Sequence, residues 1–302
     1  MPSAGAEAGD AGPTELPGAS AARLPTVAAG LARACHPEAV VAVTALITAL
    51  AAASGRSAGG CVLVACAVLT GQLSVGWCND RVDARRDTAA GRRDKPLVSG
   101  AVGLRTVAVA TGCALALCVP LSLANGAAAG LAHLTGVAAA WGYNLGVKRT
   151  ALSWLPYAVG FGLLPAFVTL GLPGRPWPPS WAVAAGALLG VGAHVTNVLP
   201  DIDADLAAGV RGLPQRLGHR RARALAPVPL FAACAVLVFG PPGAAGAAGW
   251  VALAVTGALA VATAAPAAAG SVSRLPFLAT LVTAVTAVAL LILHGGSLVT
   301  RP

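Results

Sequence analysis

Long apolar stretches separated by short polar segments dominate the chain beyond its first few dozen residues. Within each stretch, Ala, Leu, Val and Gly follow one another without the alternation of apolar and polar positions that marks a half-buried strand. A bilayer-spanning segment must satisfy its backbone hydrogen bonds internally, so stretches of roughly 18 apolar residues predict transmembrane α-helices. We therefore expect an all-α, polytopic membrane protein. Its nine predicted spans cover residues 36–54, 60–78, 104–122, 126–145, 152–171, 181–199, 223–240, 245–266 and 275–294.

The composition agrees with a membrane protein. Of 302 residues, 57% are apolar and only 10% are charged, and the mean hydropathy is +0.76. A soluble domain carries about 25% charged residues. The start of the chain is rich in Ala, Gly and Pro and lacks the basic segment and apolar core of a signal peptide. We expect a disordered cytoplasmic tail over residues 1–35 and one integral membrane domain over residues 36–302.

The basic residues predict the orientation in the cell membrane. With the N-terminus in the cytoplasm, 17 of the 20 Lys and Arg residues fall on the cytoplasmic side, and Arg56, Arg175 and Arg301 face outward. That asymmetry follows the positive-inside rule. The polar loops 91–100 and 209–218 then face the cytoplasm. A nucleic-acid partner is not expected, because no basic stripe in the sequence is interleaved with aromatic residues.

The acidic residues gather in two matched segments. Of eleven Asp and Glu residues, four precede residue 39 and all the others lie in these segments. The pattern Asn-x3-Asp-x3-Asp begins at Asn79 and returns 118 residues later at Asn197. Residues 79–105 and 197–223 are identical at ten of 27 positions. Four predicted spans separate the two segments, so their carrier helices point the same way, which predicts a parallel internal repeat.

The spacing of the acids predicts a metal site. At about 100° per residue, the Asn and Asp side chains of each motif share one face of a helix, whereas Asp203 points to the opposite side. His194 lies on the same stripe, deeper in the membrane, without an assigned role. Two columns of carboxylates repel one another unless a cation lies between them, and oxygen ligands favour Mg²⁺. The predicted metal ligands are Asn79, Asp80, Asp83, Asp87, Asn197, Asp201 and Asp205.

Basic residues on the same cytoplasmic side complete the predicted site. Carboxylates that hold Mg²⁺, surrounded by Lys and Arg, are typical of a pocket for a diphosphate. The apolar helices beneath would hold a long hydrocarbon, so an isoprenoid diphosphate fits both halves. The basic residues are Arg92, Arg93, Lys95, Lys148, Arg149, Arg211 and Arg216.

Four ordered motifs resemble those of the UbiA superfamily of intramembrane prenyltransferases. NDRVDARRD (79–87) resembles its NDxxDxxxD signature, and DIDAD (201–205) resembles its second DxxxD signature. KPLVSG (95–100) is similar to its [RK]P-x-x-SG turn, and YNLGVKRT (143–150) to its Tyr-x4-Lys element. The resemblance extends from residue 36 onward. It implies nine transmembrane helices around a central cavity.

The resemblance also implies residue roles. The two Asn-Asp motifs would hold two Mg²⁺ ions that bind the diphosphate, with Asp83, Asp87, Asp201 and Asp205 as the catalytic acids. The reaction would transfer a prenyl group to a small-molecule acceptor, either an aromatic compound or another nucleophile. The sequence leaves the identity of this acceptor open. The protein itself would be in contact with membrane lipid. The expected diphosphate-binding residues are Arg93, Lys95, Tyr143, Lys148, Arg149 and Arg216.

Other functions fit parts of the pattern. A terpene cyclase of the same superfamily shares the diphosphate site but needs an aromatic-lined cavity, and only 4% of the chain is aromatic. A divalent-cation transporter could also use carboxylates in parallel repeats, but transport favours ligands near the bilayer midplane. A CDP-alcohol phosphotransferase pairs aspartates too, yet its DGxxAR run is absent from this sequence.

Overall fold

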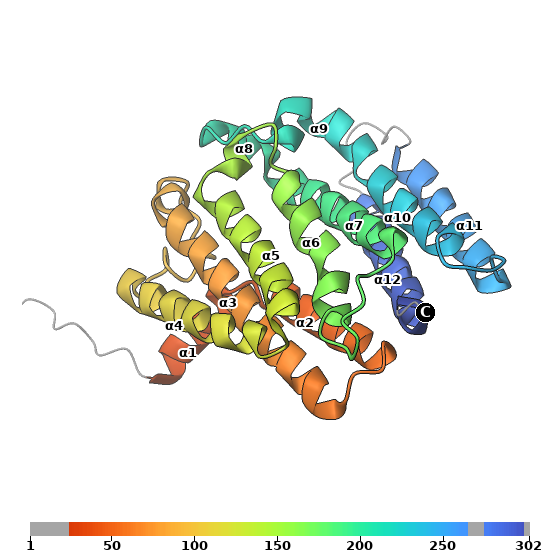
Figure 1. Ribbon diagram of the computed structural model, residues 1–302. Helices are drawn as coiled ribbons and strands as arrows, with labels where there is room; N and C mark the ends of the chain where they lie inside the picture. Colours follow the sequence, from red (N-terminus) through yellow and green to blue (C-terminus); the bar gives the residue numbers. More distant parts are fainter. Residues whose placement is uncertain (1–23, 265–274, 299–302) are drawn as a thin grey trace, which may run out of the picture.

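The computed structural model describes residues 24–264 and 275–298, and every regular element in these ranges is helical (Figure 1). The α-helices are α1 (Leu24–Ala34), α2 (Pro37–Ala53), α3 (Ala58–Ala89), α4 (Leu104–Leu123), α5 (Ala127–Leu145), α6 (Leu155–Thr169), α7 (Ser180–Val198), α8 (Ile202–Ala207), α9 (Leu213–Leu225), α10 (Pro227–Phe239), α11 (Ala247–Ala264) and α12 (Leu275–Leu293). Short 3-10 turns are η1 (Val147–Arg149), η2 (Leu199–Asp201) and η3 (Gly295–Leu298). The all-α prediction is confirmed.

Each predicted span overlaps a helix, but the count of nine spans is not confirmed. Within the described residues, three helices are long and apolar enough to cross a membrane, or up to five if each bent pair forms one span. Leu155–Thr169, Ala247–Thr263 and Leu281–Leu293 are apolar but shorter. The predicted span 223–240 is divided between α9 and α10, which meet at 46°.

Part of the predicted disordered tail is helical, since Leu24–Ala34 form α1. Helix α1 precedes α2 and meets it at 66°. The indole of Trp77 on α3 donates to the Leu31 carbonyl at 2.8 Å, and Arg33 donates to the Asp94 carbonyl at 2.9 Å. These bonds anchor α1 to α3 and to the loop after α3. Residues 1–23 lie outside the described part of the chain.

Small residues allow α6 and α7 to pack closely. A Cβ atom at Gly186 would lie 2.6 Å from the Phe161 carbonyl oxygen, and one at Gly190 would overlap the Tyr157 carbonyl. Close approach at small residues is a common way to pack transmembrane helices, where dispersion contacts replace the hydrophobic effect. Helix α7 is thereby fixed against α6, and it carries the second acidic motif at its end.

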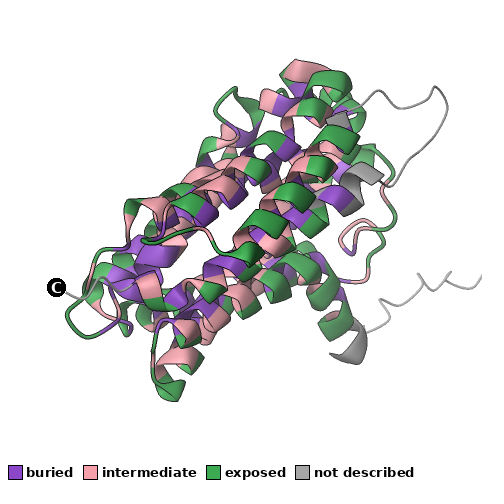
Figure 2. Ribbon diagram, turned by 90° about the vertical axis from the view of Figure 1, so that its right-hand side faces the viewer, coloured by how far each residue is buried: buried purple, intermediate pink, exposed green. Residues whose placement is uncertain are grey.

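Exposed apolar side chains cover the outside of the bundle. Figure 2 shows buried residues on the inner faces of the helices and exposed residues on the outer faces. Among the large exposed apolar residues are Val41 on α2, Leu131 on α5 and Val261 on α11. A soluble monomer rarely leaves such a surface open to water, so these faces suit contact with lipid.

Candidate functional site

The first acidic motif lies on one continuous helix, as the sequence predicts. Helix α3 extends to Ala89, well past the predicted span end at residue 78, so Asp80, Asp83 and Asp87 stand on its final turns. All three carboxylates are buried, and Asn79 beside them is half-buried. Burial of three acids requires positive partners, because isolated carboxylates lose a large solvation energy.

The second motif spans three consecutive helical segments, α7, η2 and α8, and not one regular α-helix. Helix α7 ends at Val198, the 3-10 turn η2 follows, and Asp201 has the non-helical angles φ −101° and ψ 3°. Pro200 lacks a backbone N–H, which removes the hydrogen bond that would continue α7. Asn197 is exposed and the Asp201 side chain is 47% exposed, whereas Asp205 on α8 is more buried.

The Arg86 guanidinium joins the two motifs. Its Nη2 donates to Asp83 Oδ2 at 2.9 Å, and its Nη1 lies 3.4 Å from Asp205 Oδ1. Its Nε is 3.8 Å from Asp87 Oδ1. The two acidic segments therefore both contact the Arg86 guanidinium.

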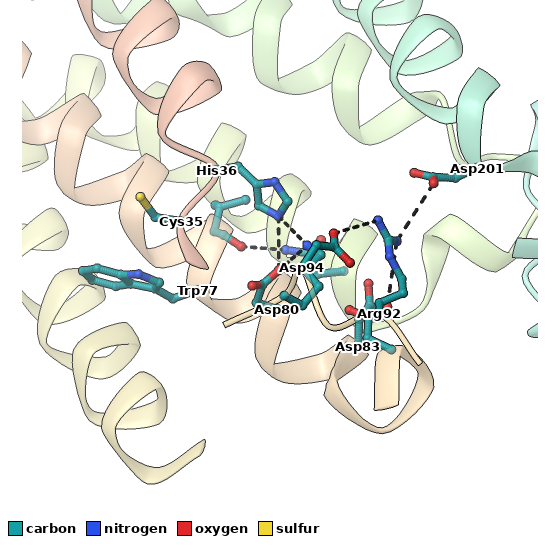
Figure 3. A network of polar contacts seen from close by, with 12 residues as sticks. Cys35, His36, Trp77, Asp80, Asp83, Arg92, Asp94 and Asp201 are labelled. Atoms are coloured by element: carbon teal, nitrogen blue, oxygen red, sulfur yellow. Dashed lines mark hydrogen bonds and ion pairs between the residues drawn. The ribbon is translucent and has the colours of Figure 1, made fainter. Parts of the chain in front are cut away.

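Arg92 forms a second, looser link between the motifs (Figure 3). Its Nη1 lies 4.0 Å from Asp87 Oδ1 and 4.0 Å from Asp201 Oδ1. Its Nη2 lies 3.9 Å from the exposed Asp94. All four predicted catalytic acids are thus paired with Arg86 or Arg92.

Lys148 pairs with the first motif. The residue lies in η1, just after α5, and its Nζ donates to Asp83 Oδ1 at 2.6 Å. Only 5% of its side chain is exposed. Burial lowers the pKa of the Lys148 ammonium, and the Asp83 carboxylate opposes that shift. Lys148 therefore carries a partly desolvated positive charge, which attracts an anion more strongly than a solvated one does.

Asp80 belongs to a separate group of contacts. Its Oδ1 accepts from Lys95 Nζ at 2.7 Å and lies 3.2 Å from His36 Nε2 (Figure 3). Its Oδ2 is buried and has no hydrogen-bond partner among the described residues. Lys95 is thus paired with Asp80. The contacts of Asp80 are with the α1–α2 junction and with the loop after α3, and none is with Arg86.

The other predicted residues lie in different surroundings. Arg93, Arg149 and Arg216 are exposed, and none forms an ion pair with a carboxylate of the described chain. The Tyr143 ring packs edge-on against Tyr157 and His194, with centroids 5.2 Å and 5.6 Å away. The structure therefore places the central acids and Lys148 close together, whereas Arg93, Arg149 and Arg216 lie apart from these acids.

Asp203 lies apart from the acid site, as the sequence predicts. Its side chain is 87% exposed, and its Oδ1 is 3.0 Å from His219 Nε2. Its neighbour Asp205, two residues later, turns toward the site. Asp203 is therefore a suitable control residue for the acids of the second motif.

Sequence reasoning missed Arg86 and Gln215. Gln215 on α9 is buried and donates through Nε2 to Asp205 Oδ2 at 2.8 Å. Arg86 stands three residues after Asp83, a spacing that places both on one helical face, so the signal was present. No comparable signal marks Gln215, because its contact depends on how α9 folds back onto α8.

A buried network holds the loop before α9. Ser153 Oγ accepts from the Leu213 backbone N–H at 2.9 Å and bonds His194 Nε2 at 3.0 Å. A Cβ atom at Gly212 would lie 2.7 Å from the Lys148 carbonyl oxygen and 2.8 Å from Ser153 Oγ. His194 therefore ties α7 to the loop that leads to Gln215, a structural role that the sequence left unassigned.

The donor set fits Mg²⁺ in its chemistry, although the carboxylates are not gathered around one point. Within the described residues, no three His, Cys, Asp or Glu side chains lie close enough together to hold an ion. Instead each central carboxylate faces a cation from the protein: Lys148, Arg86 or Arg92. Hard oxygen donors from two segments, with the Arg86 and Arg92 guanidinium groups between them, suit a hard divalent cation that also binds phosphate oxygens.

Comparisons with solved structures show the fold. The chain is similar to a UbiA homolog from Archaeoglobus fulgidus bound to DMAPP and Mg²⁺, with 17% identity over 90% of this chain and 100% of that chain and a TM-score of 0.67. It is also similar to an apo UbiA homolog from Aeropyrum pernix K1, with 21% identity over 83% of this chain and 96% of that chain and a TM-score of 0.65. A digeranylgeranylglyceryl phosphate synthase structure matches at 13% identity, 89% and 98% coverage and a TM-score of 0.61.

The sequence itself identifies the family. No curated protein matches the chain. The model of the UbiA prenyltransferase family matches residues 40–265, well over half of the sequence, and confirms the resemblance to this family. This chain belongs to the UbiA prenyltransferase family.

Proposed function

We propose that this protein is a Mg²⁺-dependent membrane prenyltransferase that moves the prenyl group of an isoprenoid diphosphate to an acceptor nucleophile. One observation carries the proposal: Asp83 and Asp205, from the two repeats, share the Arg86 guanidinium. Because carboxylates repel a polyanion such as a diphosphate, they bind one only when cations lie between the two groups. Family membership and the homologs bound to GPP or DMAPP with Mg²⁺ support the same class of substrate.

The residues divide into metal ligands and diphosphate ligands. Mg²⁺ bound to these acids would neutralise the diphosphate and make it a better leaving group. Lys148, buried and positive, would contact a diphosphate oxygen directly. The exposed cations would attract the diphosphate to the cytoplasmic face. The proposed metal ligands are Asn79, Asp83, Asp87, Asn197, Asp201 and Asp205, and the proposed exposed cations are Arg93, Arg149 and Arg216.

The proposed reaction proceeds by ionisation. The allylic C–O bond breaks, and its electron pair leaves with the diphosphate. A carbon or oxygen of the acceptor then donates an electron pair to the allylic carbon, and the acceptor loses a proton. The apolar helices beneath the acids exclude water, which would otherwise trap the allylic cation as an alcohol.

One observation favours a second candidate, a terpene cyclase. The only two tyrosines of the chain, Tyr143 and Tyr157, lie together with His194, and Phe161 stacks 6.5 Å from Tyr157. Aromatic faces stabilise a nearby cation, as a cyclase requires. In that case the isoprenoid attacks its own cation, and no acceptor takes part.

An assay with purified protein separates these candidates. We would incubate the protein with Mg²⁺ and dimethylallyl, geranyl, farnesyl or geranylgeranyl diphosphate, with and without phenolic and alcoholic acceptors, and measure released diphosphate and products. Release that requires both Mg²⁺ and an acceptor supports the transferase. Hydrocarbon or cyclic alcohol formed without an acceptor supports the cyclase. Absence of Mg²⁺-dependent diphosphate release from every substrate contradicts both.

A further inference from the structure

Arg86 is the one residue of the described chain whose side chain reaches acids of both motifs at short distance. Its contacts are 2.9 Å to Asp83, 3.4 Å to Asp205 and 3.8 Å to Asp87. Arg92 also spans the motifs, but both of its contacts to Asp87 and Asp201 are 4.0 Å. At that length the Arg92 pairs are weak, so Arg86 dominates the link.

The internal repeat makes this arrangement asymmetric. The position equivalent to Arg86 in the second motif is Ala204. Only one of the two motifs therefore contributes a cation to the space between them. Arg86 itself is 25% exposed, so its side chain has open space on one side into which it can move.

Charge balance explains why an arginine lies there. Buried carboxylates that face one another repel, and the free energy of that repulsion grows as water is excluded. The two-pronged guanidinium bonds Asp83 with one nitrogen and approaches Asp205 with another, a geometry that a lysine ammonium does not reproduce. Without bound metal, Arg86 therefore holds the two motifs together.

The same contacts compete with metal binding. A carboxylate oxygen that accepts a short bond from a guanidinium has less electron density to offer a divalent cation. Asp83 Oδ1 is already paired with Lys148, so Asp83 Oδ2 is the oxygen that Arg86 and a metal would share. Asp205 Oδ2 accepts a hydrogen bond from Gln215, so Asp205 Oδ1 is likewise the oxygen that Arg86 and a metal would share.

We propose that Arg86 is an internal counter-cation that Mg²⁺ displaces from Asp83 and Asp205, and that the released guanidinium then binds the diphosphate. The metal half of the inference rests on the geometry of the acids. The diphosphate half rests on the proposed function. Arg86 thus acts both as a positioning residue without ligand and as a substrate-binding residue with it.

The test measures binding of Mn²⁺, a spectroscopic substitute for Mg²⁺, from the electron paramagnetic resonance signal of the free ion. Arg86→Gln removes the charge and retains much of the volume. We expect Arg86→Gln to bind Mn²⁺ about tenfold more tightly than wild type without diphosphate, the effect of one charge-assisted bond. Arg86→Lys should give an intermediate affinity. The matched control is Arg85→Ala, since Arg85 is exposed on the outer side of α3 beside Thr88 and Leu104 and should leave Mn²⁺ binding unchanged.

Thermal unfolding gives a second readout. In EDTA, Arg86→Gln should unfold at a lower temperature than wild type, because the acids then repel without compensation, and Mn²⁺ should restore the difference. Unchanged or weaker Mn²⁺ binding by Arg86→Gln would overturn the exchange. A loss of stability that Mn²⁺ does not restore would overturn it as well.

A further measurement keeps the two proposals distinguishable. With Mn²⁺ present, Arg86→Gln should bind geranyl diphosphate about tenfold more weakly than wild type if its charge reaches the diphosphate. Equal diphosphate affinity would remove that half of the inference and leave the metal exchange intact. If wild type binds Mn²⁺ with the expected dependence on Arg86 but binds no isoprenoid diphosphate, the proposed function fails while the exchange stands.

Discussion

Lys148 Nζ lies 2.6 Å from Asp83 Oδ1, and both side chains are buried. The pair links η1, at the end of α5, to the acidic end of α3. A buried ion pair adds little net stability, but removal of one partner leaves an uncompensated charge. Each of these two charges therefore compensates the other, and replacement of one residue should leave the charge of its partner uncompensated.

Replacement of Lys148 tests its contact with the diphosphate. We expect Lys148→Ala to weaken binding of an isoprenoid diphosphate about tenfold or more, because one charge-assisted contact contributes roughly 1.5–3 kcal/mol. The number of Mn²⁺ ions bound should stay the same, since an ammonium is not a metal ligand. Lys148→Arg should recover part of the affinity. Equilibrium binding measures the diphosphate affinity of wild type and both variants at saturating Mn²⁺, and a Mn²⁺ titration measures the number of ions bound. An unaltered diphosphate affinity in Lys148→Ala would remove this residue from the site.

The network around Ser153 should stabilise the fold. Ser153→Ala leaves the Leu213 N–H and His194 Nε2 without their shared partner in a buried place. Such a loss costs about 1–3 kcal/mol, so thermal unfolding in detergent should shift to lower temperature. Ser54→Ala is the control: Ser54 is also buried but bonds only the Leu50 carbonyl of its own helix. Equal shifts for the two variants would mean that the network adds no more than an ordinary intrahelical bond.

Close packing of α6 against α7 predicts unequal effects of two glycine substitutions. Gly186→Ala places a methyl group 2.6 Å from the Phe161 carbonyl oxygen, which backbone movement must relieve at a cost of about 1–3 kcal/mol. Gly112→Ala on α4 meets no atom within 4 Å and should be neutral or slightly stabilising. The comparison uses thermal unfolding of both variants. Similar stability of both would show that α6 and α7 separate without cost.

Orientation in the membrane is testable with single cysteines. We expect Ala90→Cys and Ala208→Cys to react with a membrane-impermeant thiol reagent only from the cytoplasmic side, and Arg175→Cys only from outside. All three positions are exposed, and the native Cys113, also exposed, is first replaced by Ser. Labelling of positions 90 and 208 from opposite sides would contradict a shared site for the two motifs.

The sequence was sufficient to predict that acids of the two motifs lie near one another. The repeat of Asn79 and Asn197 marks both motifs, and the helical spacing of Asp83 and Asp87 is local, so it survives in α3. The second motif departs from that spacing because Pro200 interrupts the helix. Pro200 is visible in the sequence, so this departure could have been predicted from it.

Other features depend on tertiary contacts that local patterns do not contain. The bond from Gln215 to Asp205 arises only when α9 folds back over α8. The attachment of α1 through Leu31 joins segments distant in sequence, so local patterns predict a disordered tail there and not a helix. For a related reason, the sequence overestimates how many arginines lie next to the acids. A predicted position on the same side of the membrane limits where a side chain lies, but it does not bring Arg149 or Arg216 into contact with the acids.

The central claim is that the two acidic motifs act on one diphosphate through shared metal. A double-mutant cycle tests it most directly, with Mn²⁺-dependent binding of geranyl diphosphate as the measurement and Asp83→Ala, Asp201→Ala and their combination as the variants. Each single change should abolish most Mn²⁺-dependent binding and turnover, the double variant should be little worse than either, and exposed Asp203→Ala should resemble wild type. Independent, additive losses from Asp83→Ala and Asp201→Ala, or equal damage from Asp203→Ala, would contradict a shared site.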